Sequence, residues 1–240
     1  MFTKDNKKVV VKFEKGKAGF NDYIIAQTLF NAKIPNFIKY YCYFNCKEDP
    51  IVFDNLPKIN VPGEHHLNFC TGPGDEMGFI VMPFYRLGSV KNYTWTRQNF
   101  DQLKTVLKQV FLSLVTAFLE SGFIHKDPHL DNILIRKTKK QNLSYRDIHL
   151  KLSGYYAIIV DFGRAEMNGN SKDFFTSIQI IFSLLRDIGD KTTVIIDSLI
   201  LVTYIHKLKS DKNEISTKIC EKILCLIDKI SIEYDKQTIL

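Results

Sequence analysis

Apolar residues recur at helical spacing between Asn99 and Ser121, in the most regular stretch of the chain. The stripe consists of Leu103, Val106, Leu107, Val110, Phe111, Leu114, Val115, Phe118 and Leu119. This spacing predicts an amphipathic helix that buries one face in a core. Gly122 follows the last turn, and a glycine in that position is typical of a helix C-cap.

Short β-branched and aromatic runs predict strands before and after this helix. The runs expected as strands are Lys7–Phe13, Phe37–Phe44, Gly78–Pro83, Asn132–Ile135 and Tyr156–Val160. The stretch Glu48–Asp75 holds several Pro and Gly residues with little periodicity, so we expect mostly loop there, with one strand at Ile51–Phe53.

Helical spacing also appears at Phe20–Ala32 and returns in the last third of the chain. The helices expected there are Lys172–Ile188, Thr193–Lys207 and Glu214–Tyr234. Turn residues dominate Phe84–Val90, and the basic, polar segment Lys137–Arg146 predicts an excursion at the surface. The order is a strand-rich first third followed by a helical remainder, which indicates an α+β protein.

Composition describes an ordinary soluble globular protein, with 45% hydrophobic and 25% charged residues. The net charge of +7 favours acidic partners such as nucleotides or acidic peptides. A lysine-rich solvated surface is the simpler interpretation, so nucleic acid is not indicated beyond this general basicity. The apolar segments Phe174–Leu185 and Thr192–Ile205 are short or interrupted by Asp197, so we expect no membrane span.

The chain has five cysteines, an odd number without paired CxxC motifs, which indicates reduced thiols in an intracellular protein. They are Cys42, Cys46, Cys70, Cys220 and Cys225. A zinc site that combines the first three with His65 and His66 is an alternative, although the spacing fits no common zinc finger. The opening segment Met1–Lys8 is polar, so no signal peptide is expected, and the expected location is the cytoplasm or nucleus.

The candidate catalytic and metal-binding residues lie in two segments, FIHKDPHLDNILI at Phe123–Ile135 and IIVDFG at Ile158–Gly163. Phosphoryl transfer requires in-line positioning, a divalent metal that neutralises phosphate charge, and an acceptor for the hydroxyl proton. Magnesium prefers oxygen ligands, which Asn132 and Asp161 can supply. Asp127 lies on the same loop as Asn132 and can face an attacking hydroxyl.

These segments resemble the protein-kinase catalytic loop H-R-D-x-x-x-x-N and the kinase D-F-G motif. The resemblance implies that Asp127 is the catalytic base, that Asn132 and Asp161 hold Mg²⁺, and that His125 is structural. Lys126 replaces the usual arginine. His129 stands where serine/threonine kinases carry a lysine that contacts the γ-phosphate, as in haspin-like, aminoglycoside and choline kinases.

Weaker matches lie upstream and extend the resemblance over roughly Val9 to Leu208. The run VVVKF is similar to the kinase V-A-I-K strand, which makes Lys12 the candidate for pairing with α- and β-phosphates, although a solvated strand end is an alternative. FIVMPFYRLGSV (Phe79–Val90) resembles the strand and hinge that hold adenine. On that alignment the gatekeeper and hinge are Met82, Pro83, Phe84 and Tyr85.

The resemblance implies a bilobal protein-kinase-like α+β fold, with a truncated β-rich first lobe at 1–83 and a mostly helical second lobe at 84–240. The implied cofactors are ATP and Mg²⁺, and the implied partner is a protein substrate. Three kinase features are missing. No G-x-G-x-x-G precedes Lys12, no A-P-E follows Gly163, and the first helix offers Asp22 in place of a glutamate that would pair with Lys12.

Haspin-like kinases also lack A-P-E, and the basic RKTKK run at Arg136–Lys140 resembles them as well. We therefore expect a divergent haspin-like serine/threonine kinase. Its compact, lysine- and isoleucine-rich sequence would suit a large DNA virus or a reduced parasite, and a viral protein would act within a host cell. The alternatives are a catalytically impaired pseudokinase and a small-molecule kinase similar to aminoglycoside or choline kinases. A further alternative is that a glycine-rich loop precedes Met1 in a longer sequence.

Overall fold

The computed structural model describes residues 2–4, 7–15, 17–45, 77–185, 188, 193–196, 198–211 and 214–234. The chain divides into two compact units. Unit 1 comprises Met1–Ala32, Ile38–Phe84 and Asp161–Arg164, and unit 2 comprises Lys33–Phe37, Tyr85–Val160 and Ala165–Leu240. Unit 1 therefore ends its main segment at Phe84, next to the expected boundary after residue 83, and also takes in the Asp161–Phe162–Gly163 motif.

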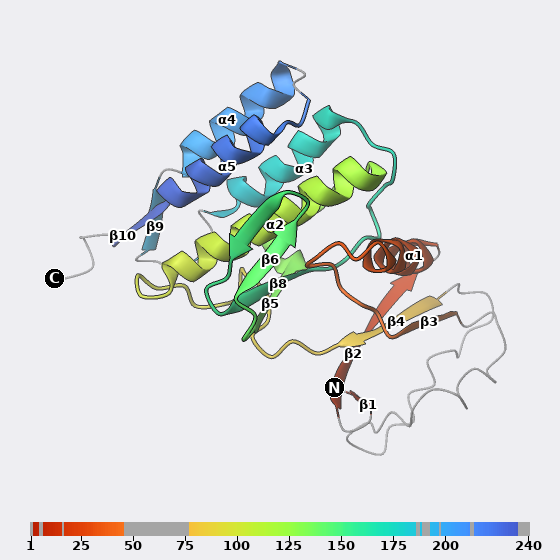
Figure 1. Cartoon of the computed structure of the whole chain (residues 1–240). Coiled ribbons are helices and arrows are strands. Elements are labelled where there is room, and N and C mark those ends of the chain that lie inside the picture. The colour runs from red at the N-terminus through yellow and green to blue at the C-terminus, as the bar shows by residue number, and fades with distance from the viewer. Residues whose placement is uncertain are drawn as a thin grey trace. The chain divides into compact units, whose positions relative to one another are not determined.

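Unit 1 is an antiparallel sheet with one helix (Figure 1). The strand order is β1-β2-β4-β3, and the strands are β1 (Phe2–Lys4), β2 (Lys7–Lys15), β3 (Cys42–Asn45) and β4 (Met77–Pro83). Alternation along β2 buries Val9 and Val11 against Phe79 and Val81 of β4, while Lys12 turns to the other side. The strand was predicted from its β-branched run, and the alternation of side chains along it decides which way Lys12 points.

The helix of unit 1, α1 (Ala18–Asn31), contacts β2, β3 and β4. It buries Ile25, Ala26 and Leu29, whereas Phe20 and Ile24 on the same helix are exposed. The fully buried Asp22 also lies on α1. Because an unpaired carboxylate is costly to bury, its partners indicate which residues of unit 1 act together.

Unit 2 is built around α2 (Phe100–Ser121), whose middle turns are buried on all sides. Three further helices complete this unit, α3 (Ser171–Ser183), α4 (Ser198–Ser210) and α5 (Thr217–Lys229) (Figure 1). The helix α5 packs against α2, Phe174 of α3 contacts Phe118 of α2, and α4 packs against α3 and α5. The expected C-cap is confirmed, because Gly122 has a φ of 63° and donates its amide to Phe118. By length and composition α2 could cross a membrane, but 67% of its most apolar window is buried, as in soluble core helices.

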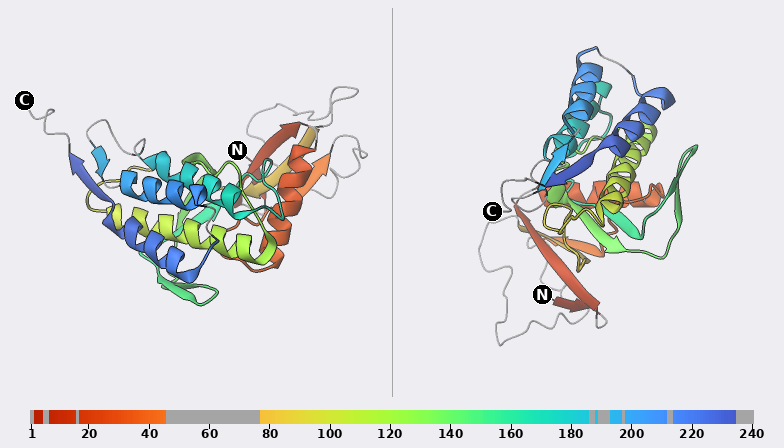
Figure 2. Two further views of the ribbon diagram at one scale, coloured as in Figure 1. Left: turned by 90° about the horizontal axis from the view of Figure 1, so that it is seen from above. Right: turned by 90° about the vertical axis from the view of Figure 1, so that its left-hand side faces the viewer.

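The segment that follows the catalytic loop forms a long antiparallel ribbon. Its paired strands are β5 (Ile133–Lys137) with β8 (Tyr155–Ile159) and β6 (Asn142–Tyr145) with β7 (Ile148–Lys151). Backbone hydrogen bonds from Thr138 to Gly154 and from Leu152 to Gln141 join the two pairs. The predicted excursion is therefore an ordered hairpin, which extends beyond the helices of unit 2 in Figure 2.

A buried polar network fastens this ribbon to α2 through Asn36. The Asn36 amide donates to Gln109 on α2 and to the backbone oxygen of Ala157, and its carbonyl oxygen accepts from Ser113 and Tyr145. Every polar atom of the Asn36 side chain is thus paired, as a buried amide requires. Asn36 also has a left-handed backbone with a φ of 70°.

The mixed α+β class is confirmed, and several expected boundaries are wrong. The aromatic run Phe37–Phe44 is not one strand, because only Cys42–Asn45 pairs and Phe37 forms a single bridge to Ile159. The terminal helices are shorter than expected, since β9 (Thr193–Ile196) and β10 (Ser231–Tyr234) pair with each other. Apolar periodicity cannot separate a short buried strand from a helix end. Glu48–Asp75, with His65, His66 and Cys70, lies outside the described residues, as does Cys46.

Candidate active site

Lys12 on β2 lies at the centre of three carboxylates in unit 1. Its Nζ is 2.9 Å from Oδ2 of Asp22 on α1, 2.7 Å from Oδ1 of Asp161, and 2.6 Å from Oε1 of Glu14. The structure therefore brings together three residues that the sequence proposed, Lys12, Asp22 and Asp161, and adds Glu14 to them. A solvated strand end, the alternative for Lys12, is wrong because its side chain is only 20% exposed.

The charges of this cluster control its protonation. Burial opposes the charged form of Lys12, but the Asp22 charge and hydrogen bonds to Asp161, Glu14 and Asp22 outweigh it and raise the pKa of Lys12. Lys12 is therefore a permanent cation at physiological pH. Burial raises the pKa of Asp22 above its usual value, while the Lys12 charge and the amide of Phe162 oppose that rise.

Asp22 connects α1 to the Asp161–Phe162 segment. Its Oδ1 accepts the backbone amide of Phe162 at 2.9 Å and the hydroxyl of Tyr40 at 2.9 Å. Burial, and then the nearby Asp22 charge, hold the pKa of Tyr40 well above 10, so its hydroxyl stays protonated and donates. The shorter aspartate thus performs the pairing expected of a glutamate, because α1 approaches β2 closely enough.

Asp161 adopts a left-handed backbone with a φ of 69°, an uncommon conformation for a residue other than glycine. Its amide donates to the Tyr40 hydroxyl at 3.4 Å, and its side chain is 39% exposed. Such backbone strain persists only where the surroundings over-determine it, and it gathers at functional sites. Tyr40, Asp22 and Lys12 supply those surroundings.

The catalytic-loop residues lie together in unit 2. The Asn132 amide nitrogen donates to the backbone oxygen of Asp127 at 3.0 Å, which holds the five-residue loop closed. The backbone of Val160 donates to Asn132 at 3.0 Å, and Nε2 of His125 donates to the Val160 oxygen at 3.0 Å. His125 is 1% exposed, which agrees with the structural role expected for it. Val160 immediately precedes Asp161 in the chain.

Other residues of this loop pair locally. Lys126, with a φ of 63°, forms an ion pair with Glu166. Asp131 accepts Lys91 at 2.9 Å, which ties the loop to the segment before α2. His129 is partly exposed, and its Nδ1 lies 3.8 Å from Oδ2 of Asp131, too far for a hydrogen bond.

The expected hinge follows β4. Met82 pairs with Val10 of β2, and the amide of Phe84 donates to the backbone oxygen of Lys8 at 3.2 Å. Because that bond occupies the Phe84 amide, this amide is not available to adenine while the bond persists. Met82, Phe84 and Tyr85 are all partly buried.

The donor chemistry fits a hard divalent cation. The Asn132 nitrogen is engaged, so its amide oxygen remains as an acceptor, and the partly exposed Asp161 offers a carboxylate. Carboxylate oxygens of Glu14, Asp22 and Asp161 also lie within 4.8 Å of one another. Because the Lys12 ammonium contacts all three, a cation at that position would have to displace it.

Sequence reasoning missed Glu14 and Tyr40. Glu14 had a usable signal, because residues two apart on a strand share a face and Lys12 was already a candidate. Tyr40 had no such signal in the sequence, because only the folded chain brings its hydroxyl next to Asp22 and Asp161.

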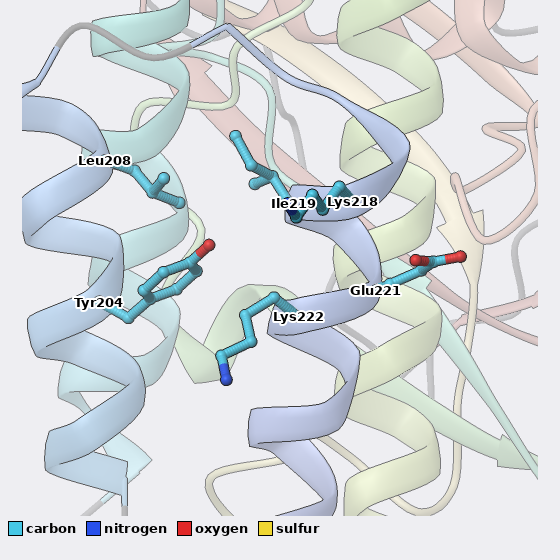
Figure 3. A pocket seen from close by; sticks show the side chains of 6 residues that line it. All are labelled: Tyr204, Leu208, Lys218, Ile219, Glu221 and Lys222. Atoms are coloured by element: carbon cyan, nitrogen blue, oxygen red, sulfur yellow. The ribbon is translucent and has the colours of Figure 1, made fainter.

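A groove in unit 2 lies apart from these residues in the chain and contains none of them (Figure 3). It has a volume of about 610 Å³ and lies between α4 and α5. The residues that line it are Tyr204, Leu208, Lys218, Ile219, Glu221 and Lys222. None of these was predicted as a site residue, and we assign the groove no part in the candidate site.

Comparison with known proteins supports a kinase-like domain. Residues 76–187 match the ABC1 atypical kinase-like domain family. A serine/threonine-protein kinase haspin homolog from Drosophila melanogaster is 29% identical over 122 residues, which cover 49% of this chain and 21% of that protein. The chain thus spans about a fifth of the length of that relative.

Among solved structures, WaaP in complex with acyl carrier protein aligns with a TM-score of 0.46 and 14% identity, over 95% of this chain and 83% of that one. The family and haspin matches support a protein-kinase-like superfamily, and the fold of the chain is a kinase-like α+β fold.

Proposed function

We propose that this chain is an ATP- and Mg²⁺-dependent, haspin-like protein kinase that transfers the γ-phosphate of ATP to a serine or threonine hydroxyl. The ion-pair cluster of Lys12, Asp22 and Asp161 carries the proposal. A partly buried cation held ready by two carboxylates, one of them on a strained backbone, suits a phosphate-binding group better than a purely structural ion pair.

Each residue of the candidate site would have its own role in phosphoryl transfer. Lys12 would neutralise phosphate charge, and Asp22 would hold Lys12 in place through its own contacts to Phe162 and Tyr40. Asp161 and Asn132 would hold the divalent cation, which spreads and neutralises the phosphate charge. Asp127 would accept the proton of the acceptor hydroxyl, on a loop that Asn132 keeps closed.

A protein acceptor is supported by the sequence similarity to the haspin homolog. Protein kinases need an exposed loop for the acceptor, and the Asp127 side chain is only partly buried. His129 is also partly exposed on the same loop, where it would face the transferred phosphate.

Calorimetry with ATP and a radiolabel assay test the proposal together. The parent should bind ATP only when Mg²⁺ is present and should label serine- or threonine-containing peptides but not alanine counterparts. Asp161→Ala should abolish binding, whereas Asp127→Ala should bind ATP normally and lose transfer by a factor of about 10² to 10⁴. Equal transfer by parent and both variants would falsify the site assignment.

The position of Glu14 favours a second candidate function, that of a nucleotide-binding pseudokinase. This third carboxylate competes for Lys12 and adds a negative charge beside it, which opposes phosphate binding. Metal-dependent ATP binding without transfer to any peptide, aminoglycoside or choline would identify the pseudokinase. Transfer to the two small acceptors alone would identify a small-molecule kinase.

A further inference from the structure

The positive charge of the chain gathers on the ribbon between β5 and β8. Its six cationic side chains are Arg136, Lys137, Lys139, Lys140, Arg146 and Lys151. Asp147 is the single carboxylate in this stretch, so the ribbon carries +6 − 1 = +5 of the whole chain's +7. Composition alone suggested general basicity, whereas most of the net charge lies in this one segment, which the structure shows to be an ordered hairpin.

The six cations are exposed and are not neutralised locally. Within the described part of the chain, none of them forms an ion pair, although Lys12, Lys91 and Lys126 each have a carboxylate partner. Arg136 lies over the ring of Tyr156, with its Cζ 4.6 Å from the ring centroid, a contact that leaves its charge in place. Like charges on one hairpin repel one another, and an anionic ligand would relieve that repulsion.

The ribbon presents these charges on an ordered backbone. Leu143 and Tyr145 of β6 are buried, which turns Asn142 and Ser144 outward. The register places Asn142 opposite Lys151 and Ser144 opposite His149, and the hydroxyl of Ser144 lies 2.9 Å from the His149 ring. Hydrogen-bonding side chains of Asn142, Ser144 and His149 thus lie exposed on the same ribbon as the charges.

The chemistry of this surface selects its partner. Protein interfaces are anchored by aromatic and aliphatic side chains. None of the exposed large hydrophobic side chains in the described residues lies between Arg136 and Lys151. Nucleic-acid interfaces are instead polar, strongly positive and rich in Lys and Arg contacts to phosphates. We propose that the Arg136–Lys151 ribbon binds the phosphodiester backbone of a nucleic acid.

The dimensions are compatible. From Arg136 to the turn at Arg146 the ribbon spans ten residues, at most about 33 Å, close to one turn of a duplex at about 34 Å. The contacts are to phosphates and carry no base specificity. The proposal needs no catalytic step, so it stands or fails separately from the proposed kinase activity.

Fluorescence anisotropy of the full chain with a labelled 20-base-pair DNA duplex, between 50 and 200 mM salt, tests this surface. The triple variant Lys137→Gln, Lys139→Gln, Lys140→Gln should flatten the slope of log K against log salt by about 2 to 3 units and weaken binding at least about tenfold at 100 mM salt. Single-stranded DNA and RNA of equal length establish which nucleic acid binds best.

The matched control removes three exposed or partly exposed lysines elsewhere, with Lys207→Gln, Lys218→Gln and Lys222→Gln. It has the same net charge as the test variant and should retain the parental slope within about one unit. Three results would overturn the proposal: equal losses in both triple variants, no binding at 50 mM salt, or equal competition by polyglutamate at matched charge, which would indicate an acidic protein partner.

Discussion

The hydroxyl of Tyr40 donates to Oδ1 of Asp22 over 2.9 Å and accepts the backbone amide of Asp161 at 3.4 Å. One buried phenol therefore contacts both the residue that holds Lys12 and the residue expected to hold the cation. Because Lys12 contacts both carboxylates as well, the four residues form a closed circuit. Tyr40, which belongs to none of the kinase motifs, therefore helps to hold the strained backbone of Asp161 through its side-chain hydroxyl.

Tyr40→Phe should open this circuit while keeping the ring packed against Phe162. Losing one hydrogen bond to a buried carboxylate should lower the free energy of unfolding by about 1.5 to 3 kcal/mol. Magnesium-dependent ATP affinity should fall several-fold, with a smaller effect on the rate at saturating ATP. Urea unfolding and calorimetry measure these effects, and Tyr204→Phe is the matched control that should change neither.

Lys12→Met should leave three carboxylates without their shared cation and lower stability by about 2 to 4 kcal/mol at pH 8. In the parent, the raised pKa of Lys12 keeps its stabilising charge up to at least its ordinary value of 10.5. In the variant, the pKa of Asp22 rises further, and stability is lost as pH increases through that pKa. The defect measured by urea unfolding should therefore be smaller at pH 5 than at pH 8. Lys8→Met, an exposed change on the same strand, is the control, and an equal defect at both pH values contradicts the coupling.

Glu14→Gln should act in the opposite direction on nucleotide binding. It removes one negative charge from beside Lys12 but leaves the pairs with Asp22 and Asp161 in place. A partly exposed pair of this kind contributes up to about 1 kcal/mol, so ATP affinity should rise by about threefold to fivefold. Asp22→Asn should instead lower affinity. A decrease for both variants, measured by calorimetry, would show that Glu14 supports Lys12 rather than competing for it.

Gly122→Ala should destabilise unit 2 by about 2 to 4 kcal/mol. The added Cβ would meet the Asn168 backbone at 2.6 Å, in a left-handed conformation with a φ of 63°. Gly88 has a similar φ of 74° with nothing within 4 Å, so Gly88→Ala isolates the conformational cost of about 1 to 2 kcal/mol. If thermal unfolding gives the same loss for both variants, the contact with Asn168 is unimportant.

Local patterns were sufficient for much of the fold. The apolar runs of β2 and β4 and the helical spacing of α2 are local features of the sequence, so these elements were predicted within a few residues. The aromatic run before β3 misled, because Phe37 and Tyr40 are buried by contacts to unit 2 and unit 1 respectively without strand pairing. These buried aromatic residues therefore gave the sequence a strand-like pattern although they do not form a strand.

By itself the sequence determined which residues are candidates for phosphoryl chemistry, because the order and spacing of Asp127, Asn132 and Asp161 are properties of a linear chain. Only the tertiary structure decided how Lys12 is held, since Glu14, Asp22 and Tyr40 reach it or its partners through the sheet and α1. It likewise decided that the basic segment Arg136–Lys151 forms an ordered ribbon. Ion pairs and hydrogen bonds form between groups a few ångströms apart in space, and the separation of two residues along the chain does not reveal whether they meet.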